Sequence, residues 1–496
     1  MSQLADSIKR CDALIRAGDF DAVQKMLTGM KTTSLSRLNR LELAGLCRRA
    51  GLSNLGLRIL APIVNSSREN WQENASPAEM AEYAINLQCS GALREARWTL
   101  SHVDAKKAPE ANLYLAMCLF SSWDYAEAIE ALETFINEDV TPYQRLVGRV
   151  NLAAALVAVR RFDQAFAVIS ESIDAANNES STRLHANCLE LRAQANIYLR
   201  NFREARADLS EASRLLSASG SLDLFFVRKW IAIMDALESE KTGPLLDFRQ
   251  EALKRRHWES VREADRFALE VKFAQSTFDG LVFGTPHRSY RDSLLSCFSS
   301  IALPETLLLG GPTGPIFDIQ TGEISGATNG KFEKPPLKVH RLLEILLRDF
   351  YRPAVNGGIF SELFPGEYFD PLTSVHRVHQ AIYRARKWLD KNGVPIEIVE
   401  DCGAYSIKLN SSFGILVPYE RRPIEIESVR IESLRRRFGE QEFTTREACS
   451  LLDISASSFK ELCSHAIENR TLQRIGATTS ARYRFISEAI VDSKAA

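Results

Sequence analysis

The first 275 residues carry apolar side chains at the spacing of amphipathic helices, and a short phrase recurs along them. The phrase has a small or polar residue, an aromatic residue or leucine two positions on, and a small or apolar residue three positions further. Its copies are RAGDFDAV, CSGALREA, SSWDYAEA, VRRFDQAF and LRNFREAR, with a degenerate copy in RRAGLSNLG. Their closing small or apolar positions are Val23, Gly56, Ala96, Ala128, Ala165 and Ala205, at intervals of 32 to 40 residues. This recurrence predicts a stack of helix pairs.

Small residues are expected where the two helices of each pair touch. These are Ala84, Ala116 and Ala153 on the first helices and Ala96, Ala128 and Ala165 on the second. Aromatic side chains would fill the grooves between the helices, namely Phe20, Tyr125, Phe162 and Phe202. The pattern resembles the tetratricopeptide repeat (TPR), whose nominal period is 34 residues. The resemblance covers residues 5–215, and helical periodicity extends the predicted solenoid and its cap over residues 1–275.

After this solenoid the residue pattern of the sequence changes. Residues 276–304 are expected to form a linker with one helix. Over residues 305–412, short apolar runs with glycines predict a small antiparallel sheet, followed by helices at 338–350, 358–363 and 371–391 and a strand–turn–strand at 395–409. This order of elements is typical of a winged helix-turn-helix. The sequence therefore predicts a second fold class behind the helical repeats.

The helix expected at 371–391 separates an apolar stripe from a polar one. The polar stripe is almost wholly positive or hydrogen-bonding and consists of Thr373, Arg377, Gln380, Arg384, Lys387 and Lys391. Arginine and glutamine make bidentate contacts to base edges, whereas Arg384, Lys387 and Lys391 would meet phosphates. We interpret the stripe as the face of a DNA recognition helix. A basic face in contact with water is the alternative.

The same region resembles a known family. The segments RVHQAIYRARKWL and GVPIEIVEDCGAYSIKL are similar to the DNA-binding domain of OmpR/PhoB-type response regulators. The positions that match the family's pattern are Val378, Ile382, Arg386, Leu389 and Tyr405, and ELFPGEYFD resembles the family's exit from its second helix. Ala385, Cys402 and Ala404 depart from the pattern, and the last two concern the shape of the wing.

The resemblance implies sequence-specific binding to double-stranded DNA, with the wing along the minor groove. By position, the base-reading residues would be Thr373, His376, Arg377, Gln380, Tyr383 and Arg384. The helical repeats stand where the family usually has a phosphoacceptor receiver domain. Input would therefore arrive through the solenoid.

A second, smaller winged-helix domain is predicted over residues 413–496. Thr444 or Thr445 can cap one helix with Glu447 in its first turn, and Ser455 can cap the next. The expected apolar contacts are Ala448, Leu451, Ile454, Phe459 and Leu462. Its candidate DNA contacts are Ser457, Ser458, Lys460, Arg474, Arg482 and Arg484. Contact with a protein is an equally open role for this domain.

Composition limits these interpretations. The 496 residues fit roughly three domains. Lys plus Arg number 62 against 63 Asp plus Glu, so any nucleic-acid role must come from a local patch. Residues 331–412 hold 12 Lys plus Arg against 10 Asp plus Glu, which is a weak excess for a DNA-binding domain. Nine scattered cysteines without a CxxC pair, and no apolar leader or membrane-length segment, predict a cytoplasmic protein.

No motif for catalysis stands out. The run GATNGKF lacks the spacing of a phosphate-binding loop, and no GxSxG, HExxH or EF-hand pattern occurs. His376 and His379 lie three residues apart, but no Cys or carboxylate neighbour completes a metal site. We expect no enzyme, no cofactor and no bound metal.

These observations predict a mainly α protein, with an N-terminal TPR-like α-solenoid followed by two α+β winged-helix domains. The leading hypothesis is a bacterial-type transcription regulator that binds duplex DNA and acts as a homodimer. Its solenoid would sense a peptide or protein partner or self-associate. The alternative is an interaction scaffold whose winged-helix domains contact proteins.

Overall fold

A computed structural model describes residues 2–17, 19–30, 35–65, 75–179, 181–217, 222–311, 314–326, 332–409, 413–421, 426–452, 454–468, 471–476 and 481–486. The chain divides into two compact units. The first comprises residues 1–302, 345–380 and 399–406, and the second comprises 303–344, 381–398 and 407–496. The border passes through one long helix and one β-hairpin, so both of these elements belong partly to each unit.

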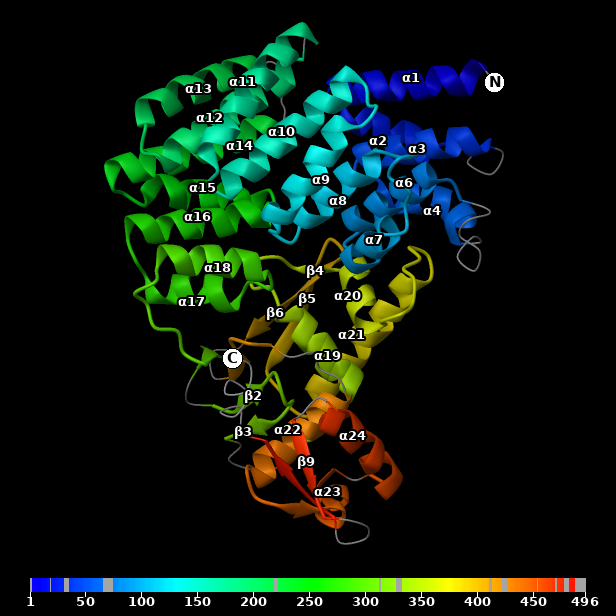
Figure 1. The fold of residues 1–496 in the computed structure, drawn as a ribbon, viewed down its shortest axis with the longest axis vertical. Helices are drawn as coiled ribbons and strands as arrows, with labels where there is room; N and C mark the ends of the chain where they lie inside the picture. The colour runs from blue at the N-terminus through cyan, green and yellow to red at the C-terminus, as the bar shows by residue number, and fades with distance from the viewer. Residues whose placement is uncertain are drawn as a thin grey trace. The chain divides into compact units, whose positions relative to one another are not determined.

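The first unit begins with a series of helices in which each folds back on the one before (Figure 1). None of the helices in the described ranges is both long and apolar enough to cross a membrane. The helices are α1 (Ser2–Ala17), α2 (Phe20–Thr28), α3 (Arg37–Arg49), α4 (Ser53–Val64), α6 (Pro77–Cys89), α7 (Leu93–Leu100), α8 (Glu110–Phe120), α9 (Tyr125–Asn137), α10 (Pro142–Ala158), α11 (Phe162–Asn178), α12 (Thr182–Tyr198), α13 (Phe202–Leu216), α14 (Leu222–Ser239), α15 (Gly243–Lys254), α16 (Trp258–Val271), α17 (Gln275–Phe283) and α18 (Arg288–Cys297).

Small residues mark the contact between the helices of a pair. The six alanines predicted for this role, Ala84, Ala96, Ala116, Ala128, Ala153 and Ala165, are all completely buried. They lie on the pairs α6/α7, α8/α9 and α10/α11, whose helices pack on each other. A larger side chain at such a site would force the helices apart. The TPR-like solenoid predicted from the sequence is confirmed.

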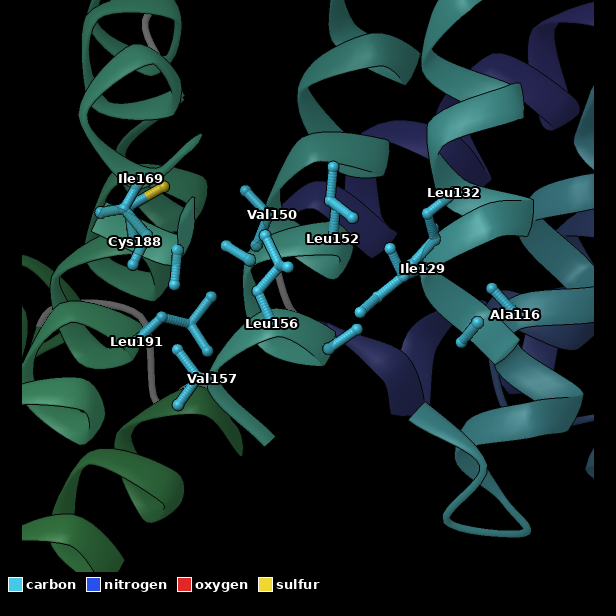
Figure 2. Packing of buried hydrophobic residues seen from close by; sticks show 14 of the residues in the cluster. Ala116, Ile129, Leu132, Val150, Leu152, Leu156, Val157, Ile169, Cys188 and Leu191 are labelled. Carbon is cyan, nitrogen blue, oxygen red and sulfur yellow. The ribbon is translucent and has the colours of Figure 1, made fainter. Parts of the chain in front are cut away.

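Apolar side chains on the remaining faces join one pair to the next. Figure 2 shows Ala116, Ile129, Leu132, Val150 and Leu191 among the side chains that point into the spaces between α8, α9, α10 and α12. A second cluster continues from α12 to α16. Because each pair buries its outer faces only against its neighbours, the stack is stable as a whole and not pair by pair.

Tight turns within the helix pairs use the left-handed backbone region. Gly51, Gly91, Trp123, Arg160 and Arg200 have φ values of 76°, 88°, 63°, 61° and 65°. Glycine adopts this conformation without strain, whereas any other residue raises the conformational energy there by about 1–2 kcal/mol. The three residues that are not glycine are therefore held in place by the helices on either side.

Two expectations for this unit need correction. Phe20 does not fill a groove between helices, because 43% of it is exposed at the start of α2. Residues 276–304, expected to be a linker with one helix, contribute to two helices, α17 and α18. Gly280, Gly284 and Pro286 made this segment look like a loop, but Phe278 and Leu281 are buried and extend the helical stack.

Residues 345–380 belong to the same unit as the solenoid. Arg262 on α16 is completely buried and donates to both carboxylate oxygens of Asp349 at 2.6 and 2.5 Å. Strand β4 (Ala354–Val355) and helix α20 (Asn356–Leu363) follow, and α20 packs on α7. Gly357 lies so close to the α6–α7 turn that a Cβ atom there would stand 2.2 Å from the carbonyl oxygen of Ser90.

The second unit contains a four-stranded sheet with the order β1-β7-β2-β3. Its strands are β1 (Thr306–Gly310), β2 (Ile316–Asp318), β3 (Ile324–Ser325) and β7 (Gly414–Pro418). β7 runs antiparallel to β1 and parallel to β2, so the sheet expected to be antiparallel is mixed. One of its two inner strands, β7, comes from beyond residue 412, where the sequence suggested a new domain. Helix α19 (Leu337–Leu346) carries His340, which makes a 2.7 Å hydrogen bond to the carbonyl oxygen of Ile319.

Helix α21 (Ser374–Lys391) and the hairpin of β5 (Ile396–Asp401) and β6 (Ala404–Leu409) cross from one unit to the other. β4 pairs with β6, which completes a three-stranded sheet with the order β4-β6-β5. The hairpin turn has positive φ values at Cys402 (51°) and Gly403 (76°). Both central residues of a type I′ turn need positive φ, so the cysteine occupies a position that favours glycine.

The C-terminal part of the second unit has its own core around Phe443, Phe459 and Tyr483. It consists of α22 (Ile426–Phe438), α23 (Thr445–Leu452) and α24 (Ala456–Glu468) with a sheet of order β8-β10-β9. The strands are β8 (Phe443–Thr444), β9 (Leu472–Ile475) and β10 (Arg482–Phe485). Thr444 forms the expected cap with Glu447. Leu451, expected to be an apolar contact, is 43% exposed, and the neighbouring Leu452 packs against the core instead.

The close approach at Gly357 gives a test of how α20 is held. We expect Gly357→Ala to lower the free energy of unfolding by about 1–3 kcal/mol, because the new methyl group meets backbone atoms that cannot turn aside. Thermal and urea unfolding of the purified chain would measure the change.

The matched control is Gly280→Ala on α17, where a Cβ atom would meet nothing within 4 Å. Removing a helical glycine should leave stability unchanged or raise it by about 0.5–1 kcal/mol. Equal stability of the two variants would contradict the packing of α20 on the α6–α7 turn.

Candidate ligand-binding cavity of the helical unit

The helices of the first unit line an open cavity of about 1440 Å³, which we call the central cavity. All of its lining residues belong to this unit. Most come from the first helices of successive pairs, α8, α10, α12 and α14, and from α16 and α18. The stacking of the helix pairs therefore sets the width of the cavity.

Ten of the side chains in the lining are aromatic. They are Tyr114, Phe120, Trp123, Tyr125, Phe135, Tyr143, Tyr198, Phe226, Trp230 and Tyr290. The rings support one another in edge-on contacts. The centre of the Trp123 ring lies 4.6 Å from the centre of the Tyr290 ring and 5.8 Å from that of the Tyr125 ring. Tyr198 and Trp230 meet in the same way at 6.1 Å. Rings fixed in this way present rigid apolar surface to a ligand at a low cost in conformational entropy.

Several polar atoms in this lining lack a hydrogen-bond partner among the described residues. They include the indole N–H of Trp230, the hydroxyl of Tyr290 and the amide oxygen of Asn187. Trp230 is 2% exposed and Tyr290 is 3% exposed. Leaving a buried polar group unpaired costs about 1–3 kcal/mol. These three atoms have almost no accessible surface in the free chain, so a bound molecule would reach them only after the side chains around them move.

Hydrogen bonds among Arg48, Glu82 and Tyr114 hold the wall near α3 and α6. Arg48 donates to Glu82 at 2.8 Å, and the Tyr114 hydroxyl donates to the same carboxylate at 2.9 Å. Burial raises the pKa of Tyr114 far above its ordinary value, so its hydroxyl keeps its proton. Arg48 also lies 5.1 Å from the centre of the Tyr114 ring. These contacts hold the tyrosine ring in the cavity wall.

The opposite wall, on α12, α14 and α16, contains buried charge. Lys229 pairs with Glu263 at 2.6 Å. Glu190 receives a 3.0 Å hydrogen bond from the side-chain amide of Gln194. Burial raises the pKa of Glu190 to about 7, although the positive charge of Lys229 acts in the opposite direction. This carboxyl group therefore gains or loses its proton near neutral pH.

The predicted DNA-contact residues lie on α21 and in the turn before it. Their side chains are exposed at Thr373, His376, Gln380, Tyr383, Arg384, Lys387 and Lys391, and half-buried at Arg377. Arg377 pairs with both oxygens of Glu367 and lies 4.0 Å over the Phe364 ring. Lys391 pairs with Glu333 at 3.0 Å. The structure thus leaves most of this face open to solvent and engages Arg377 within the protein.

The candidate contacts of the C-terminal domain also lie at its surface. The side chains of Ser457, Lys460, Arg474, Arg482 and Arg484 are exposed, and Arg482 stands 3.7 Å from Glu442. The side chain of Ser458 lies outside the described residues. The exposed side chains come from α24, β9 and β10.

No group of three or more His, Cys, Asp or Glu side chains in the described ranges is arranged to hold a metal ion. His379 instead lies 6.5 Å from the Tyr405 ring, centre to centre.

Comparison with known proteins gives limited similarity. No protein-family model and no curated protein sequence matches the chain. Among solved structures, a Rap protein in complex with Competence and Sporulation Factor is 10% identical over 60% of this chain and 98% of that chain, with a TM-score of 0.38. The apo form of RapI is 11% identical over 60% and 87% of the two chains, with a TM-score of 0.33.

A third similar structure is the C-terminal part of a TPR repeat-containing protein from Cytophaga hutchinsonii. It is 13% identical over 55% of this chain and 99% of that chain, with a TM-score of 0.29. Scores of this size do not carry an argument about function. The helix pairs of this chain themselves define its solenoid.

The sequence interpretation foresaw a concave helical surface but named none of the cavity residues. The signal was present in the first helix of each pair, where large aromatic and carboxamide side chains interrupt the small and aliphatic ones. Tyr114, Asn151, Gln194 and Trp230 occupy such positions on α8, α10, α12 and α14. Whether these side chains line one cavity depends on how the pairs stack, which one sequence does not specify.

The pKa of Glu190 predicts a pH-dependent stability. Its pKa is raised from 4.5 when the chain folds, so unfolding releases a proton between that value and about 7. The carboxyl group therefore opposes folding increasingly as pH rises through this window. Glu190→Gln keeps the shape and the acceptor for Gln194. We expect it to raise the free energy of unfolding by on the order of 2 kcal/mol near pH 8 and by almost nothing near pH 4.5.

Urea unfolding over this pH range measures the effect. Glu130→Gln on the exposed face of α9 is the control, and its difference from the unsubstituted chain should not vary with pH. A constant difference for Glu190→Gln as well would show that the pKa of Glu190 is the same in the folded and the unfolded chain.

Proposed function

We propose that this chain is an interaction protein whose central cavity binds an extended peptide or an unfolded segment of a partner. The observation that carries the proposal is the presence of buried, unpaired polar groups on Trp230, Tyr290 and Asn187 in a large aromatic cavity. Such groups are costly in the free chain, and a ligand that displaces the side chains covering them would supply the missing partners.

The chemistry of the lining suits a polypeptide. Each residue of a bound peptide offers one N–H donor and, at its carbonyl, one acceptor. The Trp230 N–H can donate to a carbonyl, the Asn187 amide oxygen can accept from an N–H, and the Tyr290 hydroxyl can do either. The aromatic rings would cover apolar side chains between these contacts. A volume of about 1440 Å³ also exceeds the range of about 300–1,000 Å³ found for drug-sized ligands.

For the C-terminal region we propose winged-helix domains that contact proteins. The order α19, α20, α21 and the β5–β6 hairpin supports an OmpR/PhoB-type winged helix. Two features favour a protein-contact role over DNA binding. Arg377, the expected base-reading side chain, is held by Glu367 and Phe364, and α20 packs on α7 of the solenoid. The excess of positive charge over residues 331–412 is also only two.

DNA binding is the second candidate function. One observation favours it, which is that Gln380, Arg384 and Lys387 are exposed on the same helix. On this hypothesis the full chain would bind duplex DNA in a salt-dependent way, and a homodimer would engage paired half-sites.

The cavity proposal is tested by selection from a library of random peptides of about ten residues, which extend to roughly 33 Å. We expect the purified full chain to enrich a defined set. Asn151→Trp on α10 places a large side chain in the cavity and should weaken binding of the selected peptides by about tenfold or more. Fluorescence anisotropy with labelled peptides would measure the affinities.

Glu130→Trp is the matched control, because it adds the same side chain to the exposed face of α9. It should bind like the unsubstituted chain. Equal binding by both tryptophan variants would place the peptide site outside the central cavity.

The DNA hypothesis makes a separate prediction. If α21 meets phosphates, Lys387→Ala should lower the slope of log K against log salt by about 1, whereas Lys25→Ala on α2 should not change it. Electrophoretic mobility shifts with random duplexes at several salt concentrations would give the slope. Absence of retained duplex at ~50 mM salt, where non-specific contacts are strong, would leave the protein-contact role.

A further inference from the structure

Two arginines lie together in the central cavity beside Tyr198. Arg160 stands in the α10–α11 turn, and its guanidinium carbon lies 5.2 Å from the centre of the Tyr198 ring. Arg266 on α16 donates to the Tyr198 hydroxyl at 3.3 Å. Both guanidinium groups approach the sulfur of Cys297, Arg160 at 3.4 Å and Arg266 at 4.0 Å. Arg160, Tyr198 and Arg266 all line the cavity.

Neither arginine has an acidic partner in the described part of the chain. No carboxylate oxygen there lies within 4.0 Å of a guanidinium nitrogen of Arg160 or Arg266. Glu270, whose charge acts on Arg266, pairs with Arg200 at 3.1 Å. Tyr198 and Cys297 offer neutral acceptors, which do not balance two positive charges.

The other buried arginine of α16 does have acidic partners. Arg262 lies one turn before Arg266 on α16, is completely buried, and has two carboxylate partners, Asp349 and Glu259. Arg266 is 8% exposed and has none within that distance. Burying a charge without a counter-charge costs several kcal/mol. One buried arginine of α16 is therefore neutralised by direct ion pairs within the fold, and the other lines the cavity without a carboxylate within 4.0 Å of its guanidinium group.

We propose that Arg160 and Arg266 form a carboxylate-binding subsite of the central cavity. It would receive either an Asp or Glu side chain or the C-terminal carboxylate of the bound peptide. The planar guanidinium groups match the two oxygens of a carboxylate, and the Tyr198 ring fixes their separation. The proposal rests on the peptide-binding function of the cavity and adds the charge of its ligand.

The test uses the full chain and the peptides that it selects from the random library. Each peptide is remade with a C-terminal amide, and separately with Gln or Asn in place of each Glu or Asp. We expect one of these changes to weaken binding by about tenfold or more, and the change that does so identifies the source of the carboxylate. Arg160→Gln should reduce this ratio to less than about threefold, because it removes one of the two guanidinium groups.

Arg161→Gln is the matched control. Arg161 is the next residue of the same turn, is exposed, and is not part of the cavity lining. This variant should keep the full preference for the carboxylate. Arg266→Gln is a second variant, to be compared after circular dichroism shows that it is folded. Because Arg160 is exposed, its variant gives a result even if the buried Arg266 variant does not fold.

The outcomes separate this inference from the proposed function. If selected peptides are excluded by Asn151→Trp but bind equally well after both changes of carboxylate to amide, the carboxylate subsite is overturned and the cavity function stands. The same holds if Arg160→Gln retains the full preference. If the unsubstituted chain enriches no peptide, both proposals fail.

Discussion

The close contact of helices through small residues is the constraint on which the first unit depends. Ala116 with Ala128, and Ala153 with Ala165, have no exposed surface because the helices that carry them meet there. A pair of helices in such contact still has apolar outer faces, which it buries only by stacking on the next pair. The distance between helices within a pair and the stacking between pairs together fix where every inward-facing side chain lies.

The central cavity follows from this stacking. First helices of successive pairs point their inner faces at one space, so a tyrosine on α8 and a tryptophan on α14 come to line the same cavity. The chemistry of this lining differs from that of an ordinary helical core. Trp230 and Tyr290 are buried without hydrogen-bond partners among the described residues, and Arg266 is buried without a carboxylate. Stability alone would favour apolar side chains or paired charges at these positions.

Part of this architecture could be predicted from the sequence because it depends on local periodicity. The six contact alanines, the hairpin at residues 395–409 and the Thr444 cap follow from spacing and side-chain type. Helix α17 was missed because Gly280 and Gly284 weaken the helical pattern of the sequence there. Strand β7 was missed because its partner β1 lies more than 100 residues earlier in the chain. The pairing of Arg377 with Glu367 could not be foreseen, since it depends on how the turn before α21 folds.

The central claim is that the cavity is a binding site for a polypeptide. A crystal structure of the full chain with a selected peptide tests it most directly. The account predicts a peptide that runs through the central cavity, with a carbonyl oxygen within hydrogen-bond distance of the Trp230 indole nitrogen. A peptide bound elsewhere on the protein, with the cavity unchanged, would contradict it.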